Sequence, residues 1–393
     1  MSTRHVDAPA LDVEALLDDR EVSIIVCTGA GGVGKTTTAA ALGLRAAEAG
    51  RNVCVLTIDP AKRLAQAMGL SSLDNTPRQV AGVCAPDGSG SLFAMMLDMK
   101  RTFDEVVEGN ADAQRARQIM ENPFYQSLSS SFAGTQEYMA MEKLGQLHTR
   151  AQQEGTWDLI IVDTPPSRNA LDFLDAPARL GSFLDGRFIR ILTAPARGAG
   201  KGIGRLAVMG FSVFTGVLNK ILGAQVLGDI GTFVAAIDTT FGGFRERADE
   251  TYELLKRPST CFIVIAAPER DALREAAYFV ERLRTDDMPL GGLVLNRMQD
   301  VPDVPMSAER ALAAAESLRE AAGTTPQQRE NDLTASLLTL HADRLRLADR
   351  QSHLAERFTA AHPGVPVRPV AALAEDVHDL EGLRLMGDLL TAT

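Results

Sequence analysis

The chain has 393 residues and a formal net charge of −11, because 51 acidic side chains outnumber 40 basic ones. This length suffices for one large α/β domain with a sizeable core, or for two smaller domains. The acidic balance argues against nonspecific binding to nucleic acid or to an anionic membrane surface, since both attract basic proteins. We therefore expect no nucleic-acid partner.

The N-terminal segment, residues 1–20, is polar and acidic, with only a short amphipathic stretch at Leu11–Leu17. It lacks the basic and then apolar pattern of a signal peptide. The most apolar region, Leu206–Ile237, is interrupted by Lys220 and Asp229, so it offers no run of about twenty residues to cross a bilayer. These features predict a cytoplasmic protein without a transmembrane segment.

Four cysteines occur, and no two of them form a C-x-x-C pair. Three lie in apolar runs typical of buried strands, which predicts reduced core residues. Paired thiolates of the zinc-binding kind are absent from the sequence, so no zinc site is predicted. The four residues are Cys27, Cys54, Cys84 and Cys261.

A strand expected over Val22–Cys27 is followed directly by the sequence T-G-A-G-G-V-G-K-T-T. This sequence meets the pattern G-x-x-x-x-G-K-[ST] of a phosphate-binding loop between a strand and a helix. Its glycines let backbone N–H groups point toward an anion at the N-terminus of that helix. Lys35 is placed to reach the β- and γ-phosphates, and the Thr36 hydroxyl suits Mg²⁺. The expected ATP-binding residues are Gly29, Ala30, Gly31, Gly32, Val33, Gly34, Lys35, Thr36 and Thr37.

Apolar strand-like runs alternate with helical patterns along the chain, and the first helix is expected from about Lys35 to Ala49, stopping at Gly50. This alternation predicts an α/β fold with a doubly wound, mostly parallel sheet covered by helices on both faces. Residues 21–393 are thus expected to form one P-loop ATPase domain. The strand runs are Val22–Cys27, Val53–Ile58, Leu92–Leu97, Leu159–Val162, Cys261–Ala266, Leu293–Leu295 and Val365–Val370.

Two long intervals interrupt this rhythm, and both have helical patterns. The first, about residues 175–258, is interpreted as a helical subdomain inserted into the ATPase domain. The second, about residues 300–364, contains a helical segment at Ser307–Ala322 and a charged stretch, Asp332–Ala361, with an approximate stripe of leucines. Here we expect a solvated helical hairpin packed on the sheet, without a catalytic role.

Two of the predicted strands end on an aspartate, at the edge of the sheet where this fold binds its ligands. Asp163 closes the run Leu159–Val162, as expected for the acid that holds the water shell of Mg²⁺. Asp59 follows the second strand, where an acid could orient the attacking water. Aspartate also suits the N-cap of the helix expected to begin near Ala61. Spacing alone leaves both roles of Asp59 open.

Two later strands end on polar residues. The carboxamide of Asn296 offers a donor and an acceptor for a purine edge, although asparagine is also typical of turns. Glu269 follows an earlier strand in the sequence A-P-E-R. Either residue taken alone is a weak indication of a nucleotide site.

Taken together, these blocks resemble the ArsA-like ATPases, which include arsenite-pump ATPases and the cytosolic ATPases that deliver tail-anchored membrane proteins. The resemblance extends from about Ile24 to Leu390. Its strongest blocks are Gly29–Thr37, Thr57–Ala65, Leu92–Asp98, Asp163–Leu174, Pro268–Glu269 and Asn296.

The resemblance implies a role for each of several residues. Asp59 would orient the attacking water, and Thr36 and Asp163 would be the metal-site residues. Glu269 would contact the nucleotide from across a dimer interface. The residues that would lie at the adenine are Asn296, Pro369 and Val370.

One departure from the family concerns the phosphate-binding loop. Members of this branch usually carry a lysine immediately after the first glycine, where this chain has Ala30. That lysine reaches the phosphates of the other subunit, so its loss removes a cation from the transition-state clamp. Ala30 therefore predicts slow hydrolysis, a substitute cation such as Arg168, or a related partner subunit that supplies the lysine. A homodimer and a heterodimer remain alternatives.

Arsenite transport is not expected, because the cysteines fall mainly on core strands.

The interval from residue 188 to 244 is rich in aliphatic residues and resembles in position the client groove of the targeting ATPases. We favour a local core or a dimer contact, since apolar residues at helical spacing usually form one, and keep the client groove as the alternative.

The sequence favours a cytosolic ATPase whose dimer opens and closes with the γ-phosphate and acts on an apolar protein client or a membrane partner. The alternative is a regulatory or assembly subunit that binds ATP and hydrolyses it poorly. A partition ATPase that binds DNA or membrane is disfavoured, because Asp376–Leu390 is acidic on balance.

Overall fold

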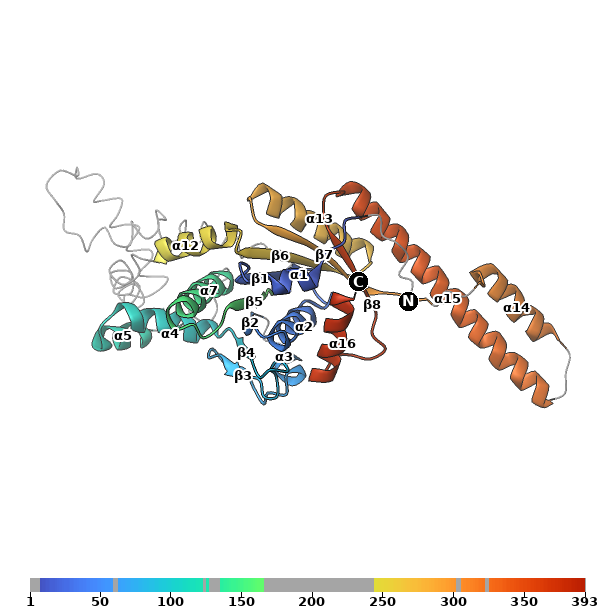
Figure 1. Ribbon diagram of the computed structural model, residues 1–393, viewed down its shortest axis with the longest axis horizontal. Coiled ribbons are helices and arrows are strands. Elements are labelled where there is room, and N and C mark those ends of the chain that lie inside the picture. Colours follow the sequence, from blue (N-terminus) through green and yellow to red (C-terminus); the bar gives the residue numbers. More distant parts are fainter. Residues whose placement is uncertain are drawn as a thin grey trace, which may run out of the picture.

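The computed structural model describes residues 8–58, 63–122, 125–126, 135–165, 244–301, 305–321 and 325–392. Its centre is an eight-stranded sheet with the order β3-β4-β2-β5-β1-β6-β7-β8 (Figure 1). All neighbouring strands are parallel except β3 and β4. The expected doubly wound, mostly parallel sheet is confirmed. The strands are β1 (Ile24–Gly29), β2 (Asn52–Thr57), β3 (Arg78–Gln79), β4 (Ser91–Met96), β5 (Leu159–Asp163), β6 (Thr260–Ala266), β7 (Leu290–Met298) and β8 (Val367–Ala371).

Helices cover both faces of this sheet (Figure 1). Side chains alternate along β1, so that Ile24 and Val26 enter one core cluster while Ile25 and Cys27 enter the other. The first cluster is closed by α4 (Met99–Asn110), α5 (Ala113–Met120), α7 (Thr135–Glu154), α12 (Phe244–Lys256) and α13 (Arg270–Thr285). The second is closed by α1 (Val13–Asp18), α2 (Lys35–Glu48), α3 (Arg63–Ala67) and α16 (Leu380–Thr391).

Each of the seven predicted apolar runs contains or overlaps a strand. The additional strand, β3, is two exposed residues long and pairs antiparallel with β4, so it carries no apolar pattern for the sequence to reveal. The first helix, α2, ends at Glu48, and the chain turns away at Gly50, which has φ +90°. Glycine adopts this left-handed conformation without strain.

The hairpin between β7 and β8 consists of α14 (Ala308–Glu320) and α15 (Thr325–Ala361). The expectation that this hairpin packs on the sheet holds only for one end of it. Ala355 and Phe358, near the C-terminus of α15, join the core cluster that α13 also closes. The other end of α15 and the whole of α14 project beyond the edge of the sheet (Figure 1). Several leucines of the approximate stripe, among them Leu333, Leu337 and Leu340, are exposed there.

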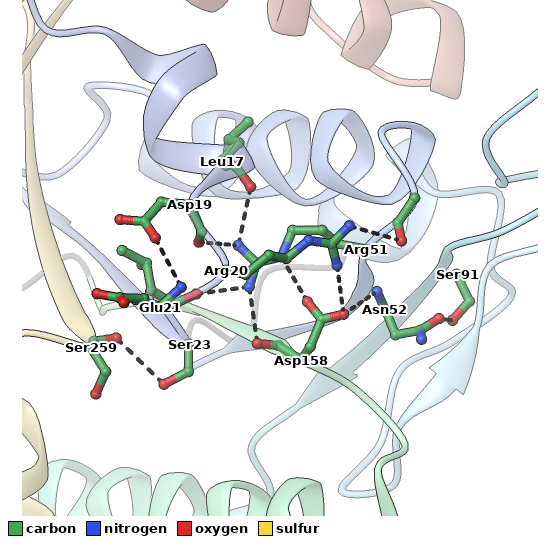
Figure 2. A network of polar contacts seen from close by, with 12 residues as sticks. Leu17, Asp19, Arg20, Glu21, Ser23, Arg51, Asn52, Ser91, Asp158 and Ser259 are labelled. Atoms are coloured by element: carbon green, nitrogen blue, oxygen red, sulfur yellow. Dashed lines mark hydrogen bonds and ion pairs between the residues drawn. The ribbon is translucent and has the colours of Figure 1, made fainter.

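A buried arginine joins the segments that enter the sheet at its amino edge, opposite the phosphate-binding loop (Figure 2). The Arg51 guanidinium, on a residue that is 1 % exposed, donates to the carbonyl oxygens of Leu17 and Asp19 at 3.1 Å and of Val22 at 2.7 Å. Its Nε also donates to Asp158 Oδ1 at 2.7 Å, and Arg20 reaches the other oxygen of that carboxylate at 3.2 Å. One side chain thus fixes α1 and the starts of β1 and β5 to each other.

Within the described residues, no helix has the combination of length and apolarity that a bilayer crossing requires. The most apolar region of the sequence, Leu206–Ile237, lies outside the described residues. So do Asp59, Arg168 and most of the predicted insertion.

Candidate functional site: a phosphate-binding loop with its metal-site carboxylate

The phosphate-binding loop connects the carboxyl end of β1 to α2, as predicted. Gly34 is the N-cap of α2 and has φ +98°, a conformation that favours glycine. A Cβ at this position would also overlap the side-chain amide of Asn296, and one at Gly29 would overlap the carbonyl oxygen of Ile265 on β6. Glycine is therefore required at both positions by close packing. Because Gly34 has no side chain to cap α2, the first N–H groups of the helix remain available to an anion.

Lys35 is the first residue of α2 and is buried. Its ammonium donates to the carbonyl oxygen of Ala30 at 2.9 Å, so it lies over the loop and does not extend into solvent. Gly31 and Gly32 are exposed at the tip of the loop, whereas Ala30 and Val33 are buried below it. The loop thus encloses its own cation, and a bound phosphate would meet that cation without a large movement.

A carboxylate with two hydroxyl donors lies behind the loop. Asp163, the last residue of β5, is 0 % exposed. Its Oδ2 accepts a hydrogen bond from Thr36 Oγ1 at 2.7 Å and another from Thr57 Oγ1, at the end of β2, at 2.8 Å. The parallel register explains this contact, because Asp163 lies beside Cys27 of β1 and Thr57 of β2.

These residues fit a magnesium ion. Mg²⁺ prefers oxygen ligands and keeps several of its waters, with one or two protein groups and the phosphates completing the shell. A Thr36 hydroxyl that donates its proton to Asp163 still has lone pairs to offer a cation. Asp163 would orient this hydroxyl and the waters of the metal. Among the described residues, no group of three or more His, Cys, Asp or Glu side chains could hold a metal ion by itself.

Thr57 was not assigned a role from the sequence. Its neighbour in the chain, Ile58, donates its N–H to the carbonyl oxygen of Asp163 at 3.1 Å. On the other side of Asp163, the Thr164 hydroxyl donates to the carbonyl oxygen of Cys27 at 2.9 Å. The segment that leads to Asp59 and the segment that follows β5 therefore both begin beside Asp163. The position of Asp59 itself lies outside the described residues, and its role stays a prediction.

The cysteines lie as the sequence predicts, with three buried and Cys84 exposed. Burial raises the pKa of the Cys54 thiol to about 12 and that of Cys261 to about 11. Burial, and then the charge of Asp163, also raises the pKa of Cys27 well above its usual value. These three thiols are buried in the core, and the described residues hold no group of three metal-ligating side chains, so they do not suit arsenite binding.

Asn296, near the end of β7, lies against the phosphate-binding loop. Its Nδ2 donates to the carbonyl oxygen of Val33 at 2.9 Å, and its Oδ1 accepts the N–H of Arg297 at 2.9 Å. Arg297 has φ +62°, which is unusual for a side chain of this size. One amide proton and one lone pair of Asn296 remain for a purine. The adenine contact of Asn296 thus stays a prediction. Its hydrogen bond to Val33 gives it a second role, because this bond braces the phosphate-binding loop.

This second role predicts the behaviour of Asn296→Ala. If Asn296 braces the loop, the variant should lose affinity for ATP and for GTP by the same factor, of about five- to tenfold for one buried hydrogen bond. Equilibrium binding of fluorescent analogues of both nucleotides measures this. A loss confined to ATP would show instead that the residue acts by reading adenine.

Three predicted nucleotide contacts remain, and they are Glu269, Pro369 and Val370. Glu269 is exposed and is the N-cap of α13, just after β6. Pro369 pairs with Leu295 in the sheet, and the side chain of Val370 is buried in the core. A contact between Val370 and a nucleotide would therefore involve its backbone. The inter-subunit role of Glu269 and the adenine roles of Pro369 and Val370 stay predictions.

Comparison with known proteins gives an independent result. The sequence profile of a family described as anion-transporting ATPase (ArsA) matches residues 22–319, more than half of the chain. The chain is 28 % identical over 294 residues to the ATPase GET3 of Podospora anserina, covering 74 % of this chain and 78 % of that protein. It is 29 % identical over 174 residues to the ATPase GET3 of Malassezia globosa, covering 44 % of this chain and 48 % of that one. By this match over residues 22–319, the chain belongs to the ArsA family of ATPases.

Proposed function

We propose that this chain uses Mg²⁺-dependent ATP hydrolysis to switch a dimer between two states that hold and release an apolar segment of a client protein, such as the tail of a tail-anchored membrane protein. The observation that carries the proposal is the contact of Thr36 and Thr57 with Asp163. This contact joins the phosphate-binding loop to the ends of two strands. Both strands continue directly into segments with predicted roles, the water-orienting Asp59 and the apolar insertion.

The chain connectivity supports coupling between the nucleotide site and the insertion. The insertion, about residues 175–258, follows β5 in the chain, so the segment that leads into it starts at Asp163 and Thr164. It returns through α12, which packs on α7. Arg247 of α12 forms an ion pair at 3.1 Å with Glu142 of α7, whose side chain is buried. The chain on one side of the insertion thus leads from Asp163, and the other side ends in a packed helix pair, so a change at Asp163 would move one side against the other.

The chemistry follows from the charges around the loop. Phosphoryl transfer to water is assisted mainly by positioning and by neutralising the charge that develops on the phosphate. Here Lys35 and the N–H groups of α2 would bind the phosphates, and Asp59 would orient the water. Mg²⁺ bound at Thr36 would supply further positive charge. The alanine at position 30 leaves this clamp one cation short of the family pattern.

Ala30 also supports a second candidate function. A chain with a complete phosphate-binding loop but an incomplete cation clamp would bind ATP and hydrolyse it slowly. Such a chain would act as a regulatory or assembly subunit beside a related ATPase that supplies the lysine.

Steady-state ATP hydrolysis by the purified chain, measured over a range of protein concentrations, separates the two candidates. We expect turnover per chain to rise with concentration, to fall by at least about 100-fold in Asp59→Asn and to rise in Ala30→Lys. Tight ATP binding without turnover at any concentration would favour the regulatory subunit. Turnover in Asp59→Asn equal to that of the unmodified chain would contradict the role of Asp59.

Binding of an apolar client segment is measured in a separate experiment. A labelled peptide of about twenty apolar residues, long enough to span a bilayer, is titrated into the same preparations with ATP or ADP. We expect its affinity to differ between the two nucleotides. Equal affinities would show that nucleotide state and client binding are not coupled.

A further inference from the structure

Thr57, the last residue of β2, places a buried hydroxyl at the nucleotide site. The residue is 1 % exposed, and its Oγ1 donates to Asp163 Oδ2 at 2.8 Å. The Thr36 hydroxyl donates to the same oxygen at 2.7 Å. Because β5 lies between β2 and β1 in the sheet, one donor comes from the end of β2 and the other from the helix that follows β1. One carboxylate oxygen is therefore shared by hydroxyls from two different segments.

The main chain holds Thr57 in place independently of its side chain. Its carbonyl oxygen accepts the N–H of Leu97, just after β4, at 2.9 Å. The next residue, Ile58, donates its N–H to the carbonyl oxygen of Asp163 at 3.1 Å. In the sheet, Thr57 pairs with Met96 on one side and with Asp163 on the other. Since threonine is restricted about χ1, a fixed backbone also restricts the direction of its hydroxyl.

The hydrogen bond from Thr57 restricts how the Asp163 carboxylate can turn. The terminal torsion of aspartate has a broad, roughly twofold preference, so its two oxygens exchange places easily unless contacts oppose this. A donor from Thr57 favours the orientation in which Oδ2 also receives the proton of Thr36. The Thr36 hydroxyl that donates in this direction keeps its lone pairs for a cation. When Mg²⁺ displaces the Thr36 hydroxyl slightly, Thr57 still holds the carboxylate.

We propose that Thr57 is a positioning residue of the Mg²⁺ site, which acts on the metal through Asp163 and without contact with the ion. This inference rests on the proposed function only in that it takes ATP with Mg²⁺ as the bound ligand. It depends neither on a client nor on the rate of hydrolysis. Residues that orient a group at a metal contribute about 10- to 100-fold to metal affinity or activity. Removing the Thr57 hydroxyl should therefore weaken Mg²⁺ binding.

Equilibrium binding of a fluorescent ATP analogue, titrated with Mg²⁺, tests the inference without requiring turnover. Thr57→Val keeps the shape of the side chain and removes the hydroxyl. We expect the Mg²⁺ concentration that gives half of the full effect on binding to rise about tenfold, while the affinity measured in EDTA stays unchanged. Thr57→Ser keeps the hydroxyl and should remain close to the unmodified chain.

The matched control is Thr260→Val. Thr260 is a buried threonine at the start of β6, and its hydroxyl donates to the carbonyl oxygen of Leu254 at 3.0 Å. The variant loses a hydrogen bond of the same kind at the opposite edge of the sheet, so its Mg²⁺ requirement should not change. If Thr57→Val does not fold, as judged from Trp157 fluorescence, Thr57→Ala has the same expected outcome.

A double variant tests whether Thr57 acts through Asp163. In the Asp163→Asn background, Thr57→Val should raise the Mg²⁺ requirement no further, because the effects of residues that act through one another are not additive. Equal rises in both backgrounds would overturn the proposal. So would a Thr57→Val variant with the Mg²⁺ requirement of the unmodified chain, or an unmodified chain whose ATP affinity does not depend on Mg²⁺. Binding without turnover would contradict only the proposed hydrolysis, so the two proposals can fail separately.

Discussion

Replacing Asp163 with asparagine should lower ATP turnover by about 100- to 1000-fold while the protein stays folded. The two side chains have nearly the same shape, so the packing at the end of β5 is preserved. An amide, however, carries no negative charge to oppose a cation. Its NH₂ group would also donate toward Thr36 or Thr57, whose hydroxyls now both donate to the carboxylate. The orientation of the Thr36 hydroxyl is therefore lost together with the charge.

Two measurements identify the cause of this loss. Turnover is recorded as a function of Mg²⁺ concentration, and the variant should require much more Mg²⁺ if Asp163 holds the metal's water shell. The control is Asp112→Asn, which removes the same charge from the N-cap of α5, where asparagine caps as well as aspartate. Its turnover should not change. Full activity of Asp163→Asn would exclude the metal-site role of this residue.

Replacing Arg51 with methionine should lower the free energy of unfolding by about 2–4 kcal/mol. Methionine keeps the unbranched part of the side chain as far as the position of Nε, but it has no guanidinium group and donates no hydrogen bond. The carbonyl oxygens of Leu17 and Val22 would each lose a donor in a buried contact, and that of Asp19 would lose one in a partly buried contact. Asp158 would lose its closest charged partner. ATP turnover at low temperature should remain, because this network lies at the edge of the sheet opposite the nucleotide site.

The structure provides both a probe and a control for this measurement. Trp157 is the single tryptophan of the chain, is buried, and precedes Asp158, so its fluorescence reports chemical unfolding at the network. Arg20 binds the same carboxylate from a side chain that is 58 % exposed. Arg20→Met should therefore cost no more than about 1 kcal/mol. Equal losses in the two variants would show that burial of Arg51 does not determine its contribution.

The features that the sequence predicts well are those that local chemistry determines. Aliphatic runs such as Leu159–Val162 have to be buried on both faces, and this identifies the central strands and the strand ends near the ligand. The glycines of the phosphate-binding loop are similarly required by backbone geometry. The position of Asp163 follows from these two features, because β5 pairs directly with β1.

Features that depend on contacts far apart in the sequence were missed. Arg51 appears in the sequence as an ordinary charged residue after a helix, and only the fold surrounds it with carbonyl groups. Asn296 contacts Val33 across 263 positions, so its role as a brace has no local signal. The leucines of α15 are a different case. The sequence predicts a solvated hairpin with an approximate leucine stripe, and Leu333, Leu337 and Leu340 are exposed in the described chain.

The position of β1 has a consequence for how the protein is made. This strand, the first in the chain, lies between β5 and β6, so the loop that follows it rests on residues synthesised much later. Gly29 packs on Ile265, and Val33 is held by Asn296. A nascent chain therefore cannot complete its nucleotide site until about three quarters of the protein has left the ribosome. The apolar interval from residue 188 to 244 emerges before that point. Any factor that protects this interval during synthesis therefore acts before the chain can bind ATP. Contacts between residues far apart in the sequence form late in general.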